Sequence, residues 1–252
     1  MKVIINADDF GLTLGNTQGI YHAHKHGIVT STTAMMNSPH IKYAEELSKQ
    51  CPDLGVGIHL TLTSRKPLTN PKTLVDENGN FFRKAAILYD EHDPDYDEIY
   101  DEWKAQMQKF ISVFHRMPTH IDSHHHVHDW NDKALAVAQR LADEYGLKMR
   151  RHCEYTFVNE FYDDISKENL IKVLEKYKGQ DIEVMCHPGC IDLELYRISS
   201  YCNQRIKELD VFCDPQVIQY CKDNDIALIH FYKNSRSDDR LNVFGRRGKD
   251  WS

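Results

Sequence analysis

The chain of 252 residues lacks any apolar run close to the roughly 20 residues that a membrane-spanning helix needs. No basic leader followed by an apolar stretch, the pattern of a signal peptide, precedes the first apolar segment. The chain also lacks an excess of basic residues, since its formal net charge is −7 whereas nucleic-acid binding requires a basic face. These absences predict a cytoplasmic protein that binds neither membranes nor nucleic acids.

A regular cysteine framework is also missing. The seven cysteines are odd in number and irregularly spaced, which is typical of reduced thiols in a cytoplasmic protein. Hydrophobic residues make up 41% of the chain and charged residues 27%, as in globular proteins. A chain of this length can form one large domain with a substantial core.

Short apolar runs alternate with amphipathic stretches, a pattern typical of β/α units and a parallel sheet. Seven strands are predicted at residues 3–7, 30–36, 56–62, 119–123, 147–150, 182–186 and 227–232. Helices are predicted at residues 14–26, 41–50, 96–115, 133–145, 166–177, 199–208 and 215–223. About seven mostly parallel strands with helices between them favour an α/β fold of the distorted β/α-barrel type, as one catalytic domain over residues 1–232.

Two segments fall outside this pattern. Residues 64–95 form a long irregular stretch, and loops of this length within a compact domain are usually lids or binding loops. Residues 233–252 carry six Lys or Arg against three Asp and show no apolar period. We expect this basic tail to be mobile, and we assign no function to it.

The densest group of functional side chains is H-I-D-S-H-H-H-V-H at residues 120–128, where five imidazoles surround Asp122. Building a fold requires no such concentration of histidine. Neutral imidazole is the commonest protein metal ligand, and its ordinary pKa also suits proton transfer near pH 7. Because the cluster follows a predicted strand, we expect it to form one wall of a metal-dependent active site.

Polar residues also end or interrupt other predicted strands. Asp8 and Asp9 end the first strand, and adjacent carboxylates repel unless a cation or proton lies between them; a helix N-cap beside a solvated neighbour would explain them as well. His59 interrupts an apolar strand, where a lone histidine is more often a hydrogen-bonded core residue. Arg150 and His187 end two further strands. Since the carboxyl ends of barrel strands share one face, these residues together predict an active site there.

These residue types suit metal-assisted hydrolysis. One carboxylate and two imidazoles leave positions on a divalent ion open for water and substrate. A second carboxylate can take the proton from that water, so Asp8 and Asp9 could divide the two roles. His187 could protonate a departing amine, and Arg150 could orient the base or stabilise an oxyanion. The substrate class does not follow from these residues.

Five blocks of the sequence resemble the YdjC-like carbohydrate deacetylases, the family that includes the chitooligosaccharide deacetylases. They follow the family's order over nearly three quarters of the chain: N-A-D-D-F-G (6–11), G-I-V-T-S-T-T-A (27–34), G-I-H-L-T-L-T (57–63), P-T-H-I-D-S-H-H-H-V-H (118–128) and E-V-M-C-H-P-G (183–189). The resemblance implies a distorted β/α barrel that removes acetyl groups from N-acetylated sugars. The basic tail is unlike the family pattern.

The resemblance also implies a set of metal ligands, namely Asp9, His59 and His124, with magnesium as the usual ion. His128 stays a reserve ligand, because His124 and His128 have the H-x-x-x-H spacing used by the zinc-dependent polysaccharide deacetylases. Two imidazoles and a carboxylate suit zinc at least as well as magnesium, which prefers oxygen ligands. By the same resemblance, Asp8 is the general base and His187 the general acid.

The predicted substrate is a small carbohydrate, an acetylated amino sugar or short chitooligosaccharide with or without a phosphate group. We assign Asn37, His126, Phe81 and Phe82 to substrate binding, although the two aromatic rings could instead pack the long loop down. One alternative is a metal-dependent phosphoesterase or other amidohydrolase that uses His126 and His128 as an H-x-H pair. Another is a non-catalytic sugar or metal sensor. A homodimer is expected.

Overall fold

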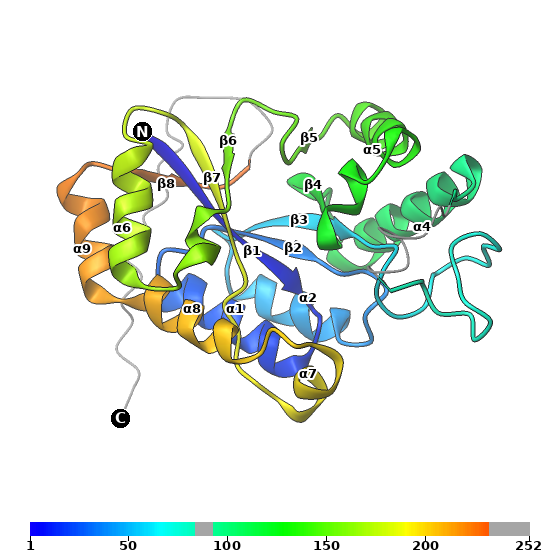
Figure 1. Ribbon diagram of the computed structural model, residues 1–252, viewed down its shortest axis with the longest axis horizontal. Helices are drawn as coiled ribbons and strands as arrows, with labels where there is room; N and C mark the ends of the chain where they lie inside the picture. The colour runs from blue at the N-terminus through cyan, green and yellow to red at the C-terminus, as the bar shows by residue number, and fades with distance from the viewer. Residues whose placement is uncertain (84–92, 232–252) are drawn as a thin grey trace.

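The strands that the structure describes form one sheet in which every pairing between neighbouring strands is parallel. A computed structural model describes residues 1–83 and 93–231. The sheet has eight strands in the order β5-β4-β3-β2-β1-β7-β6, with β8 also paired to β1. Figure 1 shows the sheet curling into a half-barrel with helices along its outer side. The predicted distorted β/α barrel is therefore confirmed.

The strands are short except for the first. They are β1 (Lys2–Phe10), β2 (Ser31–Ala34), β3 (Gly55–Leu60), β4 (His120–Ser123), β5 (Lys148–Met149), β6 (Thr156–Val158), β7 (Ile182–Cys186) and β8 (Ala227–Ile229). The α-helices are α1 (Leu14–His26), α2 (Ile41–Lys49), α4 (Tyr96–Phe114), α5 (Asp132–Tyr145), α6 (Lys167–Lys176), α7 (Leu193–Ile198), α8 (Asn203–Cys213) and α9 (Pro215–Asp223). Two 3₁₀ helices complete the described elements, η1 (His124–Asp129) and η2 (Glu160–Asp163).

Alternation along β1 separates two layers of the interior. Val3, Ile5 and Ala7 belong to the large apolar core that the sheet shares with the helices. The side chains between them face the inside of the barrel, since successive residues of a strand point to opposite faces. There Ile4 packs in a small apolar cluster with Phe231, and Asn6 contacts Asp8. The barrel interior is thus apolar near the start of β1 and polar near its end.

Helix ends are fixed by the residues that the sequence supplies for them. The Thr13 side chain accepts a hydrogen bond from the Asn16 backbone N–H at the start of α1, and Asn131 caps α5 in the same way through the Ala134 N–H. Gly146 ends α5 in a left-handed conformation, with φ 59°. Such caps satisfy backbone groups that a helix leaves unpaired at its ends.

Strand β6, helix α7 and the 3₁₀ helices η1 and η2 were not predicted. The bounds of one predicted helix were wrong, and the strands predicted at 3–7 and 227–232 are β1, which continues to Phe10, and β8, which ends at Ile229. Strand β6 has three residues and helix α7 has six, too few for a clear apolar period. The helix predicted over residues 199–208 is α8, which begins at Asn203 and continues to Cys213. The other predicted helices agree with the structure to within a residue or two at each end.

The described part of the long loop is tied to α4. Leu68 and Thr69 donate backbone hydrogen bonds to the buried carboxylate of Glu102, and the Thr69 hydroxyl donates a third. Glu98, one turn earlier on α4, binds the next part of the loop in the same manner. Residues 68–73 of this loop are therefore held in place by two glutamates of one helix.

Several other predictions can be placed. All seven cysteines lie in the described residues and are free thiols, as expected for a reduced protein. Within residues 1–83 and 93–231, no helix combines the length and apolar character needed to cross a bilayer. The last residue of the strand predicted at 227–232 and the basic tail at 233–252 lie outside the described residues. One-domain organisation over residues 1–232, a homodimer and a cytoplasmic location stay predictions.

Candidate active site

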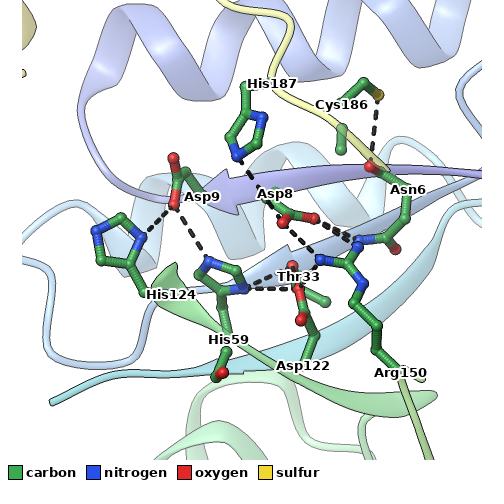
Figure 2. Close-up of polar contacts among 12 residues, drawn as sticks. Asn6, Asp8, Asp9, Thr33, His59, Asp122, His124, Arg150, Cys186 and His187 are labelled. Carbon is green, nitrogen blue, oxygen red and sulfur yellow. Dashed lines mark hydrogen bonds and ion pairs between the residues drawn. The ribbon is translucent and has the colours of Figure 1, made fainter. Parts of the chain in front are cut away.

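The end of β1 delivers two neighbouring carboxylates in different directions. The register of β1 against β2 shifts between Ala7 and Phe10, so the strand carries an irregularity there. Asp9 lies in the left-handed region with φ 72°, a conformation that few residues other than glycine, asparagine and aspartate adopt. Figure 2 shows the result: Asp8 faces Arg150, whereas Asp9 faces His59 and His124. Such irregularities at strand ends re-aim side chains.

Asp9, His59 and His124 meet at one point. Asp9 Oδ1 lies 2.9 Å from His124 Nδ1 and 3.3 Å from His59 Nε2, and one ligand atom from each residue lies within 4.8 Å of the other two. Asp9 Oδ2 accepts a hydrogen bond of 2.7 Å from Arg205 Nη2. Burial alone would raise the pKa of Asp9, but His124 and Arg205 outweigh it and hold this pKa well below its ordinary value. The carboxylate is therefore ionised.

The residues around His59 fit a divalent cation at this point. His59 Nδ1 lies 3.0 Å from Asp122 Oδ2 and 3.0 Å from the Thr33 hydroxyl, while Nε2 faces Asp9. Burial would lower the pKa of His59, but Asp122, Asp9 and Asp8 outweigh burial and raise it to about 10. The site thus favours positive charge at His59 Nε2. A divalent ion can replace that proton, with Asp122 orienting the imidazole from behind.

Arg150 connects the strands across the polar part of the barrel. It is fully buried, and its guanidinium donates two hydrogen bonds to Asp8, of 2.7 and 2.8 Å, and one of 2.7 Å to Glu183. Arg150 Nη1 also lies 2.7 Å from Asp122 Oδ2. Asp8, His59 and Asp122 form another group with ligand spacing, but the guanidinium already supplies the cation between these two carboxylates.

His187 follows β7 and faces the same place. Its Nε2 lies 3.9 Å from Asp8 Oδ2 and 3.3 Å from the Tyr162 hydroxyl. The His187 backbone N–H donates a hydrogen bond of 2.5 Å to Glu208, whose other oxygen accepts from the Tyr201 hydroxyl. Burial lowers the pKa of His187 to about 4 despite the nearby Asp8 and Asp9. The imidazole is therefore neutral at pH 7.

A cavity of about 1110 Å³ opens over these groups. Its lining includes the residues predicted as base, ligands and acid, namely Asp8, Asp9, His59, His124 and His187. Tyr162, Tyr201 and Arg205 line it as well, together with Arg65, Arg83 and Arg197. Arg150 lies beneath the cavity, where it contacts Asp8.

The residues assigned to substrate binding divide into two pairs. His126 and Phe81 line the cavity, although Phe81 is only 4% exposed and packs in the core. Asn37 and Phe82 are not among the lining residues. The Asn37 amide instead donates hydrogen bonds to the backbone oxygens of Ser64 and Lys66. The structure therefore gives Asn37 a contact with the loop and none with the cavity.

The reserve ligand His128 points elsewhere. It is fully buried, its Nδ1 lies 2.5 Å from the Ser123 hydroxyl, and its Nε2 faces Asp129 at 3.3 Å. His125 and His126 have left-handed backbones, with φ 58° and 57°. These two left-handed residues direct the side chains of His124 and His128 apart. The four-residue spacing therefore does not bring His124 and His128 to one ion.

Five side chains in contact with the predicted site residues were not themselves predicted. Asp122 and Glu183 lie in β4 and β7, Tyr162 lies in η2, and Arg205 and Glu208 come from α8. Asp122 could have been found, because it alternates with His120 in the strand that precedes the histidine cluster. Arg205 lies 196 residues from Asp9 along the chain, and its surroundings carry no motif.

The comparisons with known proteins agree with this geometry. A family model described as YdjC-like protein matches residues 2–223. The chain belongs to the YdjC-like family. The resemblance drawn from the five sequence blocks is therefore confirmed.

Two relatives of this YdjC-like chain are named for an enzymatic activity. A carbohydrate deacetylase of Geobacillus stearothermophilus is 41% identical over 244 residues, which cover 91% of this chain and 98% of that protein. A chitooligosaccharide deacetylase of Yersinia enterocolitica is 38% identical over 235 residues, covering 86% of this chain and 92% of that protein.

Two solved structures match this YdjC-like fold, one at high and one at low sequence identity. A proposed cellobiose-phosphate cleavage protein of Enterococcus faecalis is 37% identical, has a TM-score of 0.85, and is matched over 91% of this chain and 97% of that chain. A family 4 carbohydrate esterase of Streptomyces lividans, solved with acetate, is 13% identical with a TM-score of 0.52, and covers 89% of this chain and 90% of that chain. At that identity the second match concerns the fold alone.

Proposed function

We propose that this YdjC-like protein is a metal-dependent carbohydrate deacetylase that hydrolyses the N-acetyl group of an acetylated amino sugar or short chitooligosaccharide and releases acetate. The observation that supports the proposal is that the two adjacent carboxylates at the end of β1 have different surroundings. Asp9 joins His59 and His124 in a group with ligand spacing, while the adjacent Asp8 stays outside it and faces the same cavity. The names of the two relatives support the substrate class.

Asp9, His59 and His124 would hold the ion. When bound, a divalent cation polarises a substrate carbonyl and makes a water molecule more acidic. Two nitrogen donors and one oxygen donor favour zinc-type ions over magnesium, which prefers oxygen ligands. We therefore propose that zinc supports activity at least as well as magnesium.

Asp8 would act as the general base. Its Oδ1 accepts from Asn6 and Arg150, whereas Oδ2 accepts only from Arg150 among the described residues and has His187 on its other side. A carboxylate oxygen has two lone pairs, so Oδ2 can still take a proton from the attacking water. The two-point contact with Arg150 holds the carboxylate in one orientation while it does so.

His187 would protonate the departing nitrogen. Because its pKa is about 4, it does not hold that proton in the resting enzyme at pH 7. His187 Nε2 lies 3.9 Å from Asp8 Oδ2, so the proton that Asp8 takes from water can reach His187 through one bridging water and pass from there to the amine. One proton is thus moved from water to the leaving group, and both residues return to their starting states.

The cavity suits a substrate of more than one sugar. Pockets for small ligands typically enclose about 300–1,000 Å³, and this one is larger, at about 1110 Å³. The rings of Tyr162 and Tyr201 lie beside His187 and offer flat surfaces for sugar faces. Arg83 and Arg197 line the same cavity and would accommodate a phosphate group on the substrate.

The experiment is acetate release from N,N′-diacetylchitobiose and from its 6-phosphate. Metal-stripped protein is assayed with zinc, with magnesium or with no ion restored, beside His59→Ala and Asp8→Asn. We expect metal-dependent release that both variants lose. Phosphate release from the 6-phosphate without acetate would favour a phosphoesterase, and tight sugar binding without either product would favour a sensor. Acetate release that persists in the stripped protein would contradict metal dependence.

A further inference from the structure

A second group of metal-ligating side chains lies outside the cavity. We propose that His128, Asp129 and His152 form a second site for a divalent cation of the zinc type. One ligand atom from each of the three residues lies within 4.8 Å of the others. His152 Nε2 lies 2.6 Å from Asp129 Oδ1, and His128 Nε2 lies 3.3 Å from Asp129 Oδ2. None of the three residues lines the cavity of the first site.

The burial and hydrogen bonding of His128 indicate that its ring binds a ligand. Its side chain is fully buried, yet its Nε2 has no hydrogen-bond partner among the described residues. The Ser123 hydroxyl lies at the opposite ring nitrogen, Nδ1, and can accept a hydrogen bond from an Nδ1–H group. The lone pair of Nε2 is then directed toward Asp129 and His152. A buried polar nitrogen without a partner costs free energy, and a cation between it and Asp129 would remove that cost.

The donor set selects the kind of ion. Two imidazole nitrogens and one carboxylate oxygen suit zinc, cobalt or nickel, whereas calcium and magnesium prefer oxygen donors. To bind an ion, His152 Nε2 has to offer its lone pair, which requires the imidazole tautomer that carries its proton on Nδ1. Asp129 and His152 are 20% and 30% exposed at their side chains, so an ion can reach them from solvent.

One basic residue competes for the same carboxylate. Arg151 Nη1 lies 3.3 Å from Asp129 Oδ2. The Arg151 side chain is 33% exposed and rests over the ring of Phe157, 4.6 Å from its centre. A bound ion would displace this exposed contact, which as a surface ion pair contributes little. The guanidinium can remain over Phe157 when Asp129 turns to the metal.

The site would join two segments that the sheet leaves unpaired. His128 and Asp129 end η1, which follows β4, whereas His152 follows β5. Strands β5 and β6 are the two ends of the sheet order, so among the described strands no pairing closes the barrel between them. An ion at this point would tie η1 to the chain beyond β5. Because η1 begins with His124, it would also steady one ligand of the first site.

The test measures zinc bound per chain after dialysis of the full-length protein, by elemental analysis. We expect His152→Gln and Asp129→Asn to bind one zinc fewer than the unaltered protein and to lose part of the zinc-dependent rise in melting temperature. His59→Ala should lose a different zinc, so that His59→Ala combined with His152→Gln loses two. His115→Gln, which removes an exposed histidine at the end of α4, is the matched control and should lose none.

The outcomes separate this site from the first one. If His152→Gln and Asp129→Asn bind as much zinc as the unaltered protein, the second site does not exist, whatever the activity of the enzyme. If they bind one ion fewer and His59→Ala loses nothing, the second site stands and the proposal for the first site fails. A loss of one ion in His115→Gln as well would show unspecific binding and overturn the proposal.

Discussion

The guanidinium of Arg150 meets the carboxylate of Asp8 edge to edge, with Nη1 2.7 Å from Oδ2 and Nη2 2.8 Å from Oδ1. Both side chains are buried, and the two come from strand ends that are 142 residues apart in the chain. A two-point contact of this kind fixes the plane of the carboxylate as well as its position. Arg150 therefore orients the Asp8 carboxylate, although Asp8 is not one of the three residues that would bind the ion.

The first prediction concerns Asp8→Asn. An amide keeps the shape of the carboxylate but cannot take a proton from water, so we expect acetate release to fall by about 10²- to 10⁴-fold. Zinc bound per chain should not change, because Asp9, His59 and His124 are untouched. Turnover and metal content are measured on the same preparation. A variant that loses its metal together with its activity would place Asp8 among the ligands.

The second prediction concerns Asp122→Asn. Its Oδ1 can still accept a hydrogen bond from His59 Nδ1, but the negative charge behind the imidazole is lost. We expect the affinity for zinc to fall by about 10- to 100-fold, as is typical when the partner of a ligating histidine is changed. The measurement is chelator competition in the His152→Gln background, so that only the first site is observed. An unchanged affinity would mean that His59 does not bind the ion.

The third prediction concerns pH and Glu208. Burial raises the pKa of Glu208 to about 7, above its ordinary value of 4.5, against the opposing effect of Tyr201 and of the His187 backbone N–H. A folded-state pKa above the unfolded one stabilises the fold below the unfolded value, and this contribution is lost as pH rises toward 7. Glu208→Gln does not titrate, and it can retain both neighbours when its amide oxygen accepts from the His187 backbone N–H and its amide nitrogen donates to the Tyr201 hydroxyl oxygen. Relative to the variant, the unaltered protein should therefore lose up to about 3 kcal/mol of unfolding free energy between pH 4.5 and pH 8.

Urea denaturation at several pH values measures this difference. Glu175→Gln, on the exposed side of α6, provides a matched control whose stability should follow that of the unaltered protein at each pH. A constant difference between Glu208→Gln and the unaltered protein across this range would contradict the raised pKa.

The fourth prediction concerns the anchor of the long loop. Glu102→Ala removes the acceptor for the Leu68 and Thr69 backbone N–H groups and for the Thr69 hydroxyl. Unpaired buried donors cost roughly 1–3 kcal/mol each, partly recovered by water, so we expect the unfolding free energy to fall by about 3 kcal/mol. Glu98→Ala, at a more exposed position of the same helix, should cost less. Equal losses in the two variants would mean that burial of Glu102 contributes nothing.

The sequence predicted the elements whose ends are fixed locally. Helix α1 has the predicted bounds because Thr13 caps its start and the helical pattern ends at Gly27. Strand β6 was missed because its stability comes from pairing with β7, which the three residues Thr156–Val158 do not reveal. Local patterns predict caps and periods, whereas pairing depends on partners that are distant in the chain.

The same distinction applies to the site. The cluster at residues 120–128 and the carboxylates of β1 were visible because strand ends of a parallel sheet share one edge. The contact of Arg205 with Asp9 could not be predicted, since it depends on how α8 packs against α1. Nor could the separation of His124 from His128, which results from two consecutive left-handed residues at 125 and 126.

The left-handed backbone of Asp9 restricts which substitutions can report on its chemistry. Most L-residues would incur roughly 1–2 kcal/mol of backbone strain at φ 72°, whereas asparagine tolerates this region. An alanine or glutamate scan at position 9 would therefore mix the cost of folding with the loss of a ligand. Asp9→Asn removes the charge and leaves the backbone preference nearly unchanged. Very few substitutions are therefore tolerated at position 9. The backbone conformation restricts the residue type there independently of any bound ion or sugar.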